Sequence, residues 1–238
     1  MIKPTRFHVV IPCAGSGSRV GMKSPKQYAV LANFPIVLHT LSAFDAVAGM
    51  GHGVVVVAPD DQEMEKLFEL YPQDRFQIFN TGGKTRAQSV MSGLRALQQM
   101  GIDEDDWVLV HDAARCLVTP ELIQRLITTA ENDAVGGLLA LPLPDTLKSE
   151  VQGRVSKTLD RTDKWLAQTP QMFRWHLLYK ALNASADQMT DEASAIEALE
   201  MSPLLVKGAA FNFKITYAED LAMAEAILHS RQQLKENG

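Results

Sequence analysis

The sequence contains little of what defines several simple protein classes. Only two of its 238 residues are cysteines, Cys13 and Cys116, too few for a disulfide framework and without the spacing of a zinc site. We expect both to be reduced thiols that fill small spaces. The longest apolar runs, GVVVVAP and AVGGLLALPLP, are much shorter than the roughly 20 residues of a membrane-spanning helix. A disulfide-rich, zinc-binding or membrane-bound protein is therefore not expected.

An excess of positive charge is also missing. The chain has 23 lysines and arginines against 28 aspartates and glutamates, a net charge of -5, and no polybasic stretch. Neither a nucleic acid nor an anionic membrane is therefore expected as a partner, and any anion must be bound locally. The N-terminal segment lacks the apolar core of a secretion signal, so we expect a cytoplasmic protein. The length suits a single α/β domain.

Apolar segments typical of buried strands alternate with segments of helical periodicity. The predicted strands cover residues 7–12, 53–58, 76–79, 107–111 and 135–141, and the predicted helices cover 40–47, 62–70, 89–100 and a segment that Thr119 caps before Pro120. This alternation predicts an α/β fold with a mostly parallel sheet and helices on both faces. Ligands of such sheets bind beyond the carboxyl ends of the strands.

The alternation stops at about residues 142–160. The segment PLPDTLKSEVQGRVSKTLDR has no helical stripe, offers a turn at Gln152-Gly153, and alternates on both sides of it. We expect a two-stranded ribbon, and because an isolated hairpin is marginally stable, we expect it to pack on a second copy of the chain. After it we expect helices at 175–182, 191–199 and 218–233, and a strand pair at 204–208 and 211–215.

The glycine-rich stretch HVVIPCAGSGSRVGMKSPKQY resembles two known phosphate loops and matches neither. Val20 stands where a dinucleotide fingerprint needs a third glycine, and Met22 stands where a P-loop needs lysine. The small residues after the first strand still let main-chain amides approach an anion. Arg19 and Lys26 would add two cations. The stretch therefore predicts a polyphosphate site of another kind.

Two further segments place polar groups at strand ends. In TGGKTRAQSVMSGL, Gly82 and Gly83 lie between a strand and a helix. The free amides of the helix, with Lys84 and Arg86 nearby, suit a base, ribose or phosphate; the alternative is a plain turn. In VLVHDAARCLV, Asp112 follows an apolar strand and is a candidate ligand for magnesium, with Arg115 holding it in place. The alternative is a structural ion pair of these two residues. We expect His111 to be structural.

Two more cations lie far away along the chain. Arg161 follows the ribbon, and Lys214 lies in FNFKIT, where it alternates with Phe211, Phe213 and Ile215. On a strand this alternation would direct Lys214 to the face opposite the apolar side chains.

Taken together, these segments resemble the 2-C-methyl-D-erythritol 4-phosphate cytidylyltransferases of the non-mevalonate isoprenoid pathway. The resemblance rests on PCAGSGSRVG with PKQY, GGKTRAQSVMSGL, HDAAR, DTLK, QTPQMF, TDEAS and FNFKIT with EDL, in this order from residue 12 to 221. It implies a Rossmann-like nucleotidyltransferase, a homodimer that exchanges the β-arm at 142–160, and a magnesium ion, or another divalent cation, as cofactor. The implied reaction joins CTP and methylerythritol phosphate and releases pyrophosphate.

The resemblance also implies roles for individual residues. Four cations would act on the reacting phosphates or position the methylerythritol phosphate: Arg19, Lys26, Arg161 and Lys214. The nucleotide would contact Ala14, Gly15, Gly83, Lys84, Ser89, Ala113 and Arg115. Thr146, Thr169 and Thr190 would line the substrate site, and Asp112 would face the metal. In an exchanged arm, Thr146 and Arg161 would act on the partner's substrate.

The sequence departs from the family pattern at four positions, and other functions compete with this interpretation. Cys13 and Cys116 replace the usual alanine and proline, Tyr217 replaces a common proline, and Lys84 replaces a common acid, which leaves main-chain contacts for cytosine. A ribitol-5-phosphate cytidylyltransferase is the alternative within the class. A non-catalytic nucleotide-binding module is the alternative outside it. An NAD-dependent oxidoreductase would need the missing glycine and an acid about 20 residues beyond the loop.

Overall fold

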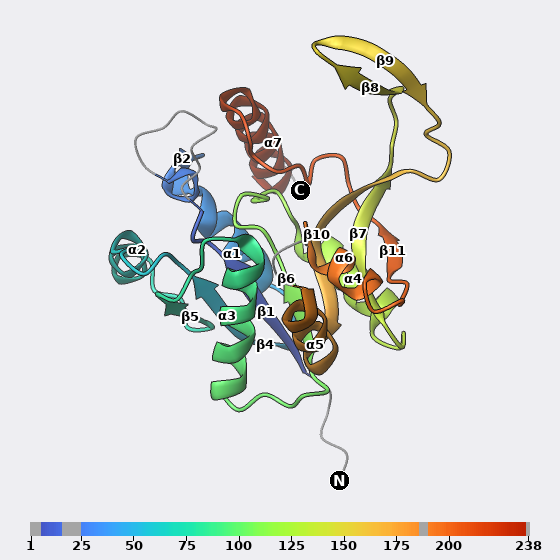
Figure 1. Ribbon diagram of the computed structural model, residues 1–238. Helices are drawn as coiled ribbons and strands as arrows, with labels where there is room; N and C mark the ends of the chain where they lie inside the picture. Colours follow the sequence, from blue (N-terminus) through green and yellow to red (C-terminus); the bar gives the residue numbers. More distant parts are fainter. Residues whose placement is uncertain (1–5, 16–24, 186–189, 237–238) are drawn as a thin grey trace.

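A seven-stranded sheet forms the centre of the protein (Figure 1). The computed structural model describes residues 6–15, 25–185 and 190–236. In spatial order the strands are β11 (Leu204–Lys207), β7 (Gly136–Pro142), β10 (Trp165–Arg174), β6 (Trp107–Val110), β1 (Phe7–Pro12), β4 (Met50–Val56) and β5 (Phe76–Phe79). Only β10 runs antiparallel to its neighbours, β6 and β7, whereas the other described neighbours are parallel. The carboxyl ends of β1, β4 and β6 therefore meet at one edge of the sheet.

Helices cover both faces of this sheet (Figure 1). One face packs against α1 (Ile36–Asp45), α2 (Glu63–Leu70) and α4 (Pro120–Ala130), and the other against α3 (Arg86–Gln99), α5 (Trp175–Ser185) and α6 (Glu192–Glu197). Strand β1 divides its side chains accordingly: Val9 and Ile11 belong to the first core and Val10 to the second, and all three are fully buried. The predicted α/β fold with a mostly parallel sheet is confirmed.

Side-chain caps fix where the helices next to the site begin. Thr85 and Gln88 form a reciprocal capping box at the start of α3, so this helix begins at Arg86, three residues earlier than predicted. Thr119 caps α4 and Pro120 is its first residue, as the sequence predicted. Asp191 and Ser194 form a second capping box on α6.

Strands β8 (Leu147–Val151) and β9 (Arg154–Leu159) form the predicted ribbon, which projects from the body of the protein (Figure 1). The turn between them uses Gln152 and Gly153, both with positive φ, and glycine takes this conformation without steric cost. Val151 and Val155 are 60% and 65% exposed. We call residues 142–160 the β-arm. A ribbon with so little packing of its own is marginal unless another surface covers it.

The chain beyond the β-arm differs from the sequence prediction in two places. The sequence analysis missed β10, whose register shifts between Ala167 and Gln171. The predicted strand at 211–215 is wrong, because these residues form a turn and an extended loop. Phe213 and Ile215 pack with the cluster under α7 (Ala218–Glu236), so their alternation reflects contact with a helix rather than a sheet.

Smaller elements complete the edge where the strands end. A 3-10 helix, η2 (Lys26–Tyr28), precedes a short pair of strands, β2 (Val30–Leu31) and β3 (Phe34–Pro35). In the part of the chain that the structure describes, no helix combines the length and apolar character needed to cross a bilayer.

Candidate active site

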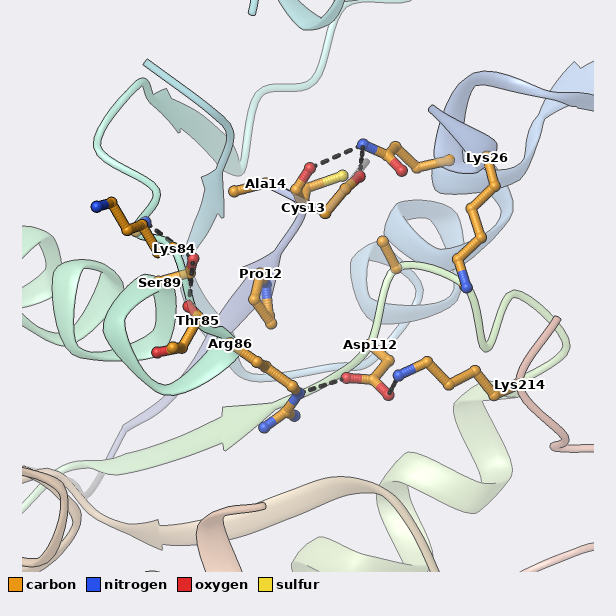
Figure 2. Close-up of a pocket in the computed structure, with 15 residues that line it drawn as sticks. Pro12, Cys13, Ala14, Lys26, Lys84, Thr85, Arg86, Ser89, Asp112 and Lys214 are labelled. Carbon is orange, nitrogen blue, oxygen red and sulfur yellow. Dashed lines mark hydrogen bonds and ion pairs between the residues drawn. The ribbon is translucent and has the colours of Figure 1, made fainter. Parts of the chain in front are cut away.

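A pocket of about 380 Å³ opens at the carboxyl ends of β1 and β6, beside the start of α3 (Figure 2). It brings together nine of the predicted site residues: Ala14, Gly15, Lys26, Gly83, Lys84, Ser89, Asp112, Ala113 and Lys214. Among the described residues, its charged lining consists of four cations, which include Arg86, and one carboxylate. In a chain with a net charge of -5, this concentration of positive charge fits a bound anion.

The loop that follows β1 is held by Gln27, which is almost fully buried. Its side-chain amide donates to the carbonyl oxygens of Cys13, at 2.8 Å, and of Gly15, at 3.2 Å. The segment after β5 lies so close that a Cβ at Gly82 would be 2.3 Å from that of Ala14 and 2.6 Å from the carbonyl oxygen of Val57. A glycine at position 82 is therefore what lets the two pocket walls meet.

The N-terminus of α3 forms another wall of the pocket. The amide of Gly83 donates to Oγ of Ser89 at 3.1 Å, and this hydroxyl donates to the carbonyl oxygen of Thr85 at 3.2 Å. Gly83 and Ser89 are thus held in place by the hydrogen bonds of the capping turn. The ammonium of Lys84 points away from Asp112 (Figure 2). Lys84 therefore adds positive charge at the rim of the pocket rather than next to Asp112.

Asp112 is the electrostatic centre of the pocket (Figure 2). Its Oδ1 accepts a hydrogen bond from Nε of Arg86 at 2.8 Å, and its Oδ2 pairs with Nζ of Lys214 at 2.7 Å. Nε of Arg115 is farther away, 4.0 Å from Oδ2. Burial alone would raise the pKa of Asp112, but Arg86 and Lys214 hold it well below its usual value. The pocket thus keeps an ionised carboxylate between two cations.

Lys26 reaches the same region from η2. Its ammonium donates to the carbonyl oxygen of Ile215 at 2.8 Å, next to Lys214 in the chain. The amide of Ile215 in turn donates to the carbonyl oxygen of Ala114 at 2.9 Å. The loop that carries Lys214 is therefore bonded both to η2 and to the segment after Asp112, which brings the two lysines to one side of the pocket (Figure 2).

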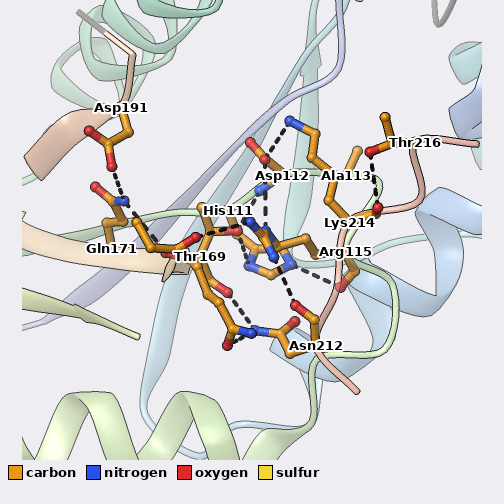
Figure 3. Close-up of polar contacts among 12 residues, drawn as sticks. His111, Asp112, Ala113, Arg115, Thr169, Gln171, Asp191, Asn212, Lys214 and Thr216 are labelled. Carbon is orange, nitrogen blue, oxygen red and sulfur yellow. Dashed lines mark hydrogen bonds and ion pairs between the residues drawn. The ribbon is translucent and has the colours of Figure 1, made fainter. Parts of the chain in front are cut away.

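A directional chain of hydrogen bonds supports Asp112 from below (Figure 3). His111 is fully buried, and burial lowers its pKa to about 3, so its ring is neutral. Its Nε2 lies 3.2 Å from the carbonyl oxygen of Arg115 and must be the protonated nitrogen, which makes Nδ1 an acceptor. Thr169 therefore donates to Nδ1 at 3.0 Å and accepts the amide of Asp112 at 3.1 Å. His111 is structural, as the sequence predicted.

Asn212 ties the Lys214 loop to this support (Figure 3). It is fully buried, and its side-chain amide donates to the carbonyl oxygen of Thr169 at 2.9 Å. The guanidinium of Arg115 donates to the carbonyl oxygen of Asn212 at 2.8 Å. Arg115 thus acts mainly on the loop that presents Lys214, and only weakly on Asp112.

Other predicted site residues do not line this pocket in the described structure. Thr169 and Arg115 lie beneath it, in the support just described. Thr146 and Arg161 are exposed at the base of the β-arm, where Arg161 donates to the carbonyl oxygen of Pro144. Thr190 is exposed just before α6. Arg19 lies outside the described residues.

The sequence analysis did not identify two residues that shape the site. Glu192 binds Arg86 from the side opposite Asp112, and Gln27 holds the loop after β1. Both lie within segments that carried the family resemblance, TDEAS and PKQY. Their burial cannot be seen in the sequence alone, and neither can the partner of Glu192, which lies 106 residues away.

A preformed metal cage is not part of the described structure. No group of three or more His, Cys, Asp or Glu side chains among the described residues is arranged to hold a metal ion. Asp112 nevertheless fits a metal ion that is only partly bound by protein side chains, because Mg²⁺ is often held by one or two carboxylates together with substrate phosphates. The residues present thus fit a metal that arrives with a nucleotide.

Comparison with known proteins identifies the family. The family profile described as 2-C-methyl-D-erythritol 4-phosphate cytidylyltransferase matches residues 7–230. The chain belongs to this family. It is therefore a nucleotidyltransferase, and the resemblance inferred from the sequence motifs is confirmed.

Individual cytidylyltransferases are similar over almost the whole chain. The protein of this name from Chromobacterium violaceum is 50% identical over 226 residues, which cover 94% of this chain and 98% of that protein. A bifunctional enzyme IspD/IspF from Albidiferax ferrireducens is 54% identical over 226 residues, or 95% of this chain. The chain spans about half of that relative, 54% of its length.

Solved structures agree with this assignment. A crystal structure of 4-diphosphocytidyl-2C-methyl-D-erythritol synthase superposes with a TM-score of 0.84 at 39% identity, and covers 94% of this chain and 99% of the other. The cytidylyltransferase from Thermus thermophilus gives a TM-score of 0.76 at 30% identity, with 94% and 98% covered. The Rossmann-like cytidylyltransferase fold is thus shared.

Proposed function

We propose that the protein transfers CMP from CTP to 2-C-methyl-D-erythritol 4-phosphate, giving 4-CDP-2-C-methyl-D-erythritol and pyrophosphate for isoprenoid precursor synthesis. The observation that carries this proposal is the cationic pocket of a cytidylyltransferase-family chain, in which Arg86 and Lys214 flank the ionised Asp112 and Lys26 lies on the same side as Lys214. Because neither anionic substrate crosses a membrane unaided, the reaction would take place in the compartment that makes both, which we propose is the cytoplasm.

The nucleotide would lie along the walls of the pocket. Ala14, Gly15 and Gly83 offer main-chain groups with little side-chain bulk in the way, and Ser89 offers a hydroxyl placed by the capping turn. These contacts suit cytosine and ribose. Main-chain recognition would also explain why Lys84, directed to the rim, can replace an acidic residue without loss of the base site.

The chemistry needs no general base. The attacking group is a phosphate oxygen that is already ionised at neutral pH, so the barrier comes from repulsion between anions and from charge gathered on the α-phosphorus. Cations that are held in place before the reaction lower this barrier by positioning and electrostatic stabilisation. Lys26 and Lys214 would supply this charge in the described pocket, and Arg19 would add to it.

Asp112 is the residue that would hold a magnesium ion or another divalent cation together with the nucleotide's phosphates. When bound, such a metal ion would neutralise phosphate charge and orient the triphosphate. The chain itself keeps Asp112 ionised through Arg86 and Lys214, and holds it in place through the hydrogen bond from its main-chain amide to the hydroxyl of Thr169.

The β-arm would complete the site of a second copy of the chain. Thr146, on the β-arm, and Arg161, directly after it, are proposed to bind the methylerythritol phosphate, yet both are exposed and neither lines the described pocket. An exchanged arm in a symmetric homodimer would place them at the partner's pocket and cover the exposed Val151 and Val155.

A mixing experiment tests this exchange. Lys26→Ala and Arg161→Ala should each be nearly inactive alone, and unfolding and refolding them together should restore activity, because each mixed dimer then contains one complete site. Mixing either variant with itself is the control. A protein that sediments as a monomer at assay concentration, or a mixture with no more activity than its components, would rule out the shared site.

The substrate is tested by measuring pyrophosphate release from CTP and Mg²⁺ with methylerythritol phosphate and, separately, ribitol 5-phosphate. We expect a kcat/KM about 100-fold higher for methylerythritol phosphate, because the longer chain of ribitol 5-phosphate moves its hydroxyl groups away from the site's polar groups, which are then left unpaired. Preference for ribitol phosphate would change the assigned substrate. Binding of CTP without release from either alcohol would favour a nucleotide-binding module.

A further inference from the structure

Glu192 is a buried carboxylate that lies beside the pocket without lining it. It is the first residue of α6, its side chain is 1% exposed, and burial raises its pKa. Both of its oxygens accept hydrogen bonds from Arg86: Oε1 from Nη1 at 2.5 Å and Oε2 from Nη2 at 3.0 Å. A buried ion pair loses much of its attraction to desolvation, so stability alone does not account for it.

The position of Arg86 shows what this pair does. Its Nη1–Nη2 edge is occupied by Glu192, and its Nε–H donates to a single oxygen, Oδ1 of Asp112. The other oxygen, Oδ2, pairs with Lys214. An arginine beside a carboxylate commonly forms two parallel N–H···O bonds, which occupy both oxygens at once. Arg86 forms no such two-pronged pair with Asp112, because only its Nε–H bonds to this carboxylate.

We propose that Glu192 is a positioning residue for nucleotidyl transfer, because by binding the Nη1–Nη2 edge of Arg86 it keeps this arginine on one oxygen of Asp112 and leaves the other to Lys214. Without Glu192, Arg86 turns its two-pronged edge to Asp112 and displaces Lys214 from the position in which it meets the reacting phosphates. The inference rests on the proposed function, and it assigns to α6 a role that acts through two other side chains.

Glu192 is itself held rigidly. The side chain of Gln171, on β10, accepts the amide of Ala193 at 2.7 Å and donates to Asp191 at 2.9 Å (Figure 3). The start of α6 is thus fixed to the central sheet on both sides of Glu192. A carboxylate on such a support can orient Arg86 without adjusting to it.

Glu192→Gln tests the inference, with Glu197→Gln as the matched control. Both changes remove one negative charge from α6, but Glu197 is exposed. We expect kcat to fall about 10- to 100-fold in Glu192→Gln, the usual effect of losing a residue that orients a functional side chain. CTP should still bind with one site per chain, which shows that the variant is folded. Glu197→Gln should match the wild type.

A double-mutant cycle separates action through Arg86 from a general structural effect. Arg86→Ala leaves Glu192 buried without its partner, so adding Glu192→Gln should raise the melting temperature above that of Arg86→Ala alone. It should also lower kcat no further, because the residue through which Glu192 acts is already gone. Losses of kcat that multiply would overturn the inference.

The outcomes also separate this inference from the proposed function. A Glu192→Gln variant as active as an active wild type would refute only the role of Glu192. If neither the wild type nor Glu197→Gln releases pyrophosphate, the proposed function fails instead. The melting temperatures can be measured even in an inactive protein. If the double variant Arg86→Ala/Glu192→Gln melts at a lower temperature than Arg86→Ala, the proposed coupling between Arg86 and Glu192 is wrong.

Discussion

Replacing Lys26 with alanine should lower kcat about 100- to 1000-fold while changing CTP affinity by less than about fivefold. The reason is where the ammonium lies: it is bonded to the carbonyl oxygen of Ile215, beside the lysine that pairs with Asp112. A cation at this place would meet charge that develops on the α-phosphorus, and removing one such preorganised donor typically costs this much. Steady-state kinetics measure kcat, and calorimetry measures the affinity for CTP.

A lysine away from the pocket provides the control for this prediction. Lys180 is exposed on α5, so Lys180→Ala removes the same charge from the chain and should leave both kcat and CTP affinity unchanged. If Lys26→Ala kept its kcat, Lys26 would have no part in the chemical step. If it lost CTP affinity and kcat/KM to the same extent with kcat preserved, it would be a binding residue only.

Replacing Asp112 with asparagine should abolish most activity, with a loss in kcat/KM of about 100-fold, the upper end of what losing a carboxylate of a metal site costs. An amide carries no charge, so it can neither hold Lys214 as an ion-pair partner nor attract a divalent cation as a carboxylate does. The variant should still fold, because Glu192 keeps Arg86 paired and the side chain of Lys214 is 36% exposed. Circular dichroism and a magnesium titration of the remaining activity check both parts.

A surface carboxylate provides the comparison for Asp112. The side chain of Asp105 is 83% exposed, so Asp105→Asn removes one negative charge with little other change and should behave as the wild type. Wild-type activity in Asp112→Asn at the same magnesium concentration would refute both roles assigned to Asp112. An unfolded Asp112→Asn would instead mean that this carboxylate is needed chiefly for structure.

Strands and helices with strong local patterns could be predicted from the sequence. The apolar runs that became β1 and β6 are buried on both faces of the sheet, so each appears in the sequence as a continuous hydrophobic segment. The Thr119-Pro120 start of α4 is set by its own cap. Strand β10 was missed, because it begins with exposed residues, contains Pro170 and depends on pairing with two strands that are distant in sequence.

The candidate site was predictable to the extent that its chemistry lies in short segments. Glycines and cations next to predicted strand ends pointed to Gly15, Lys26 and Asp112, and the structure gathers all three in one pocket. The partners of Asp112 were not predictable, since Arg115, three residues away, was the natural candidate, whereas Arg86 and Lys214 approach more closely. Such choices depend on tertiary packing, which local sequence does not encode.

Oxygen labelling tests the central claim most directly, that a phosphate oxygen of the polyol substrate attacks the α-phosphorus of CTP. The phosphate of methylerythritol phosphate is labelled with ¹⁸O, and the products are followed by mass spectrometry and by the isotope shifts in ³¹P spectra. We predict that all of the label stays in the CDP-alcohol, including the oxygen that bridges its two phosphorus atoms, and that pyrophosphate carries none. Label in pyrophosphate, an unlabelled bridge or the absence of a CDP-alcohol would contradict the proposed reaction.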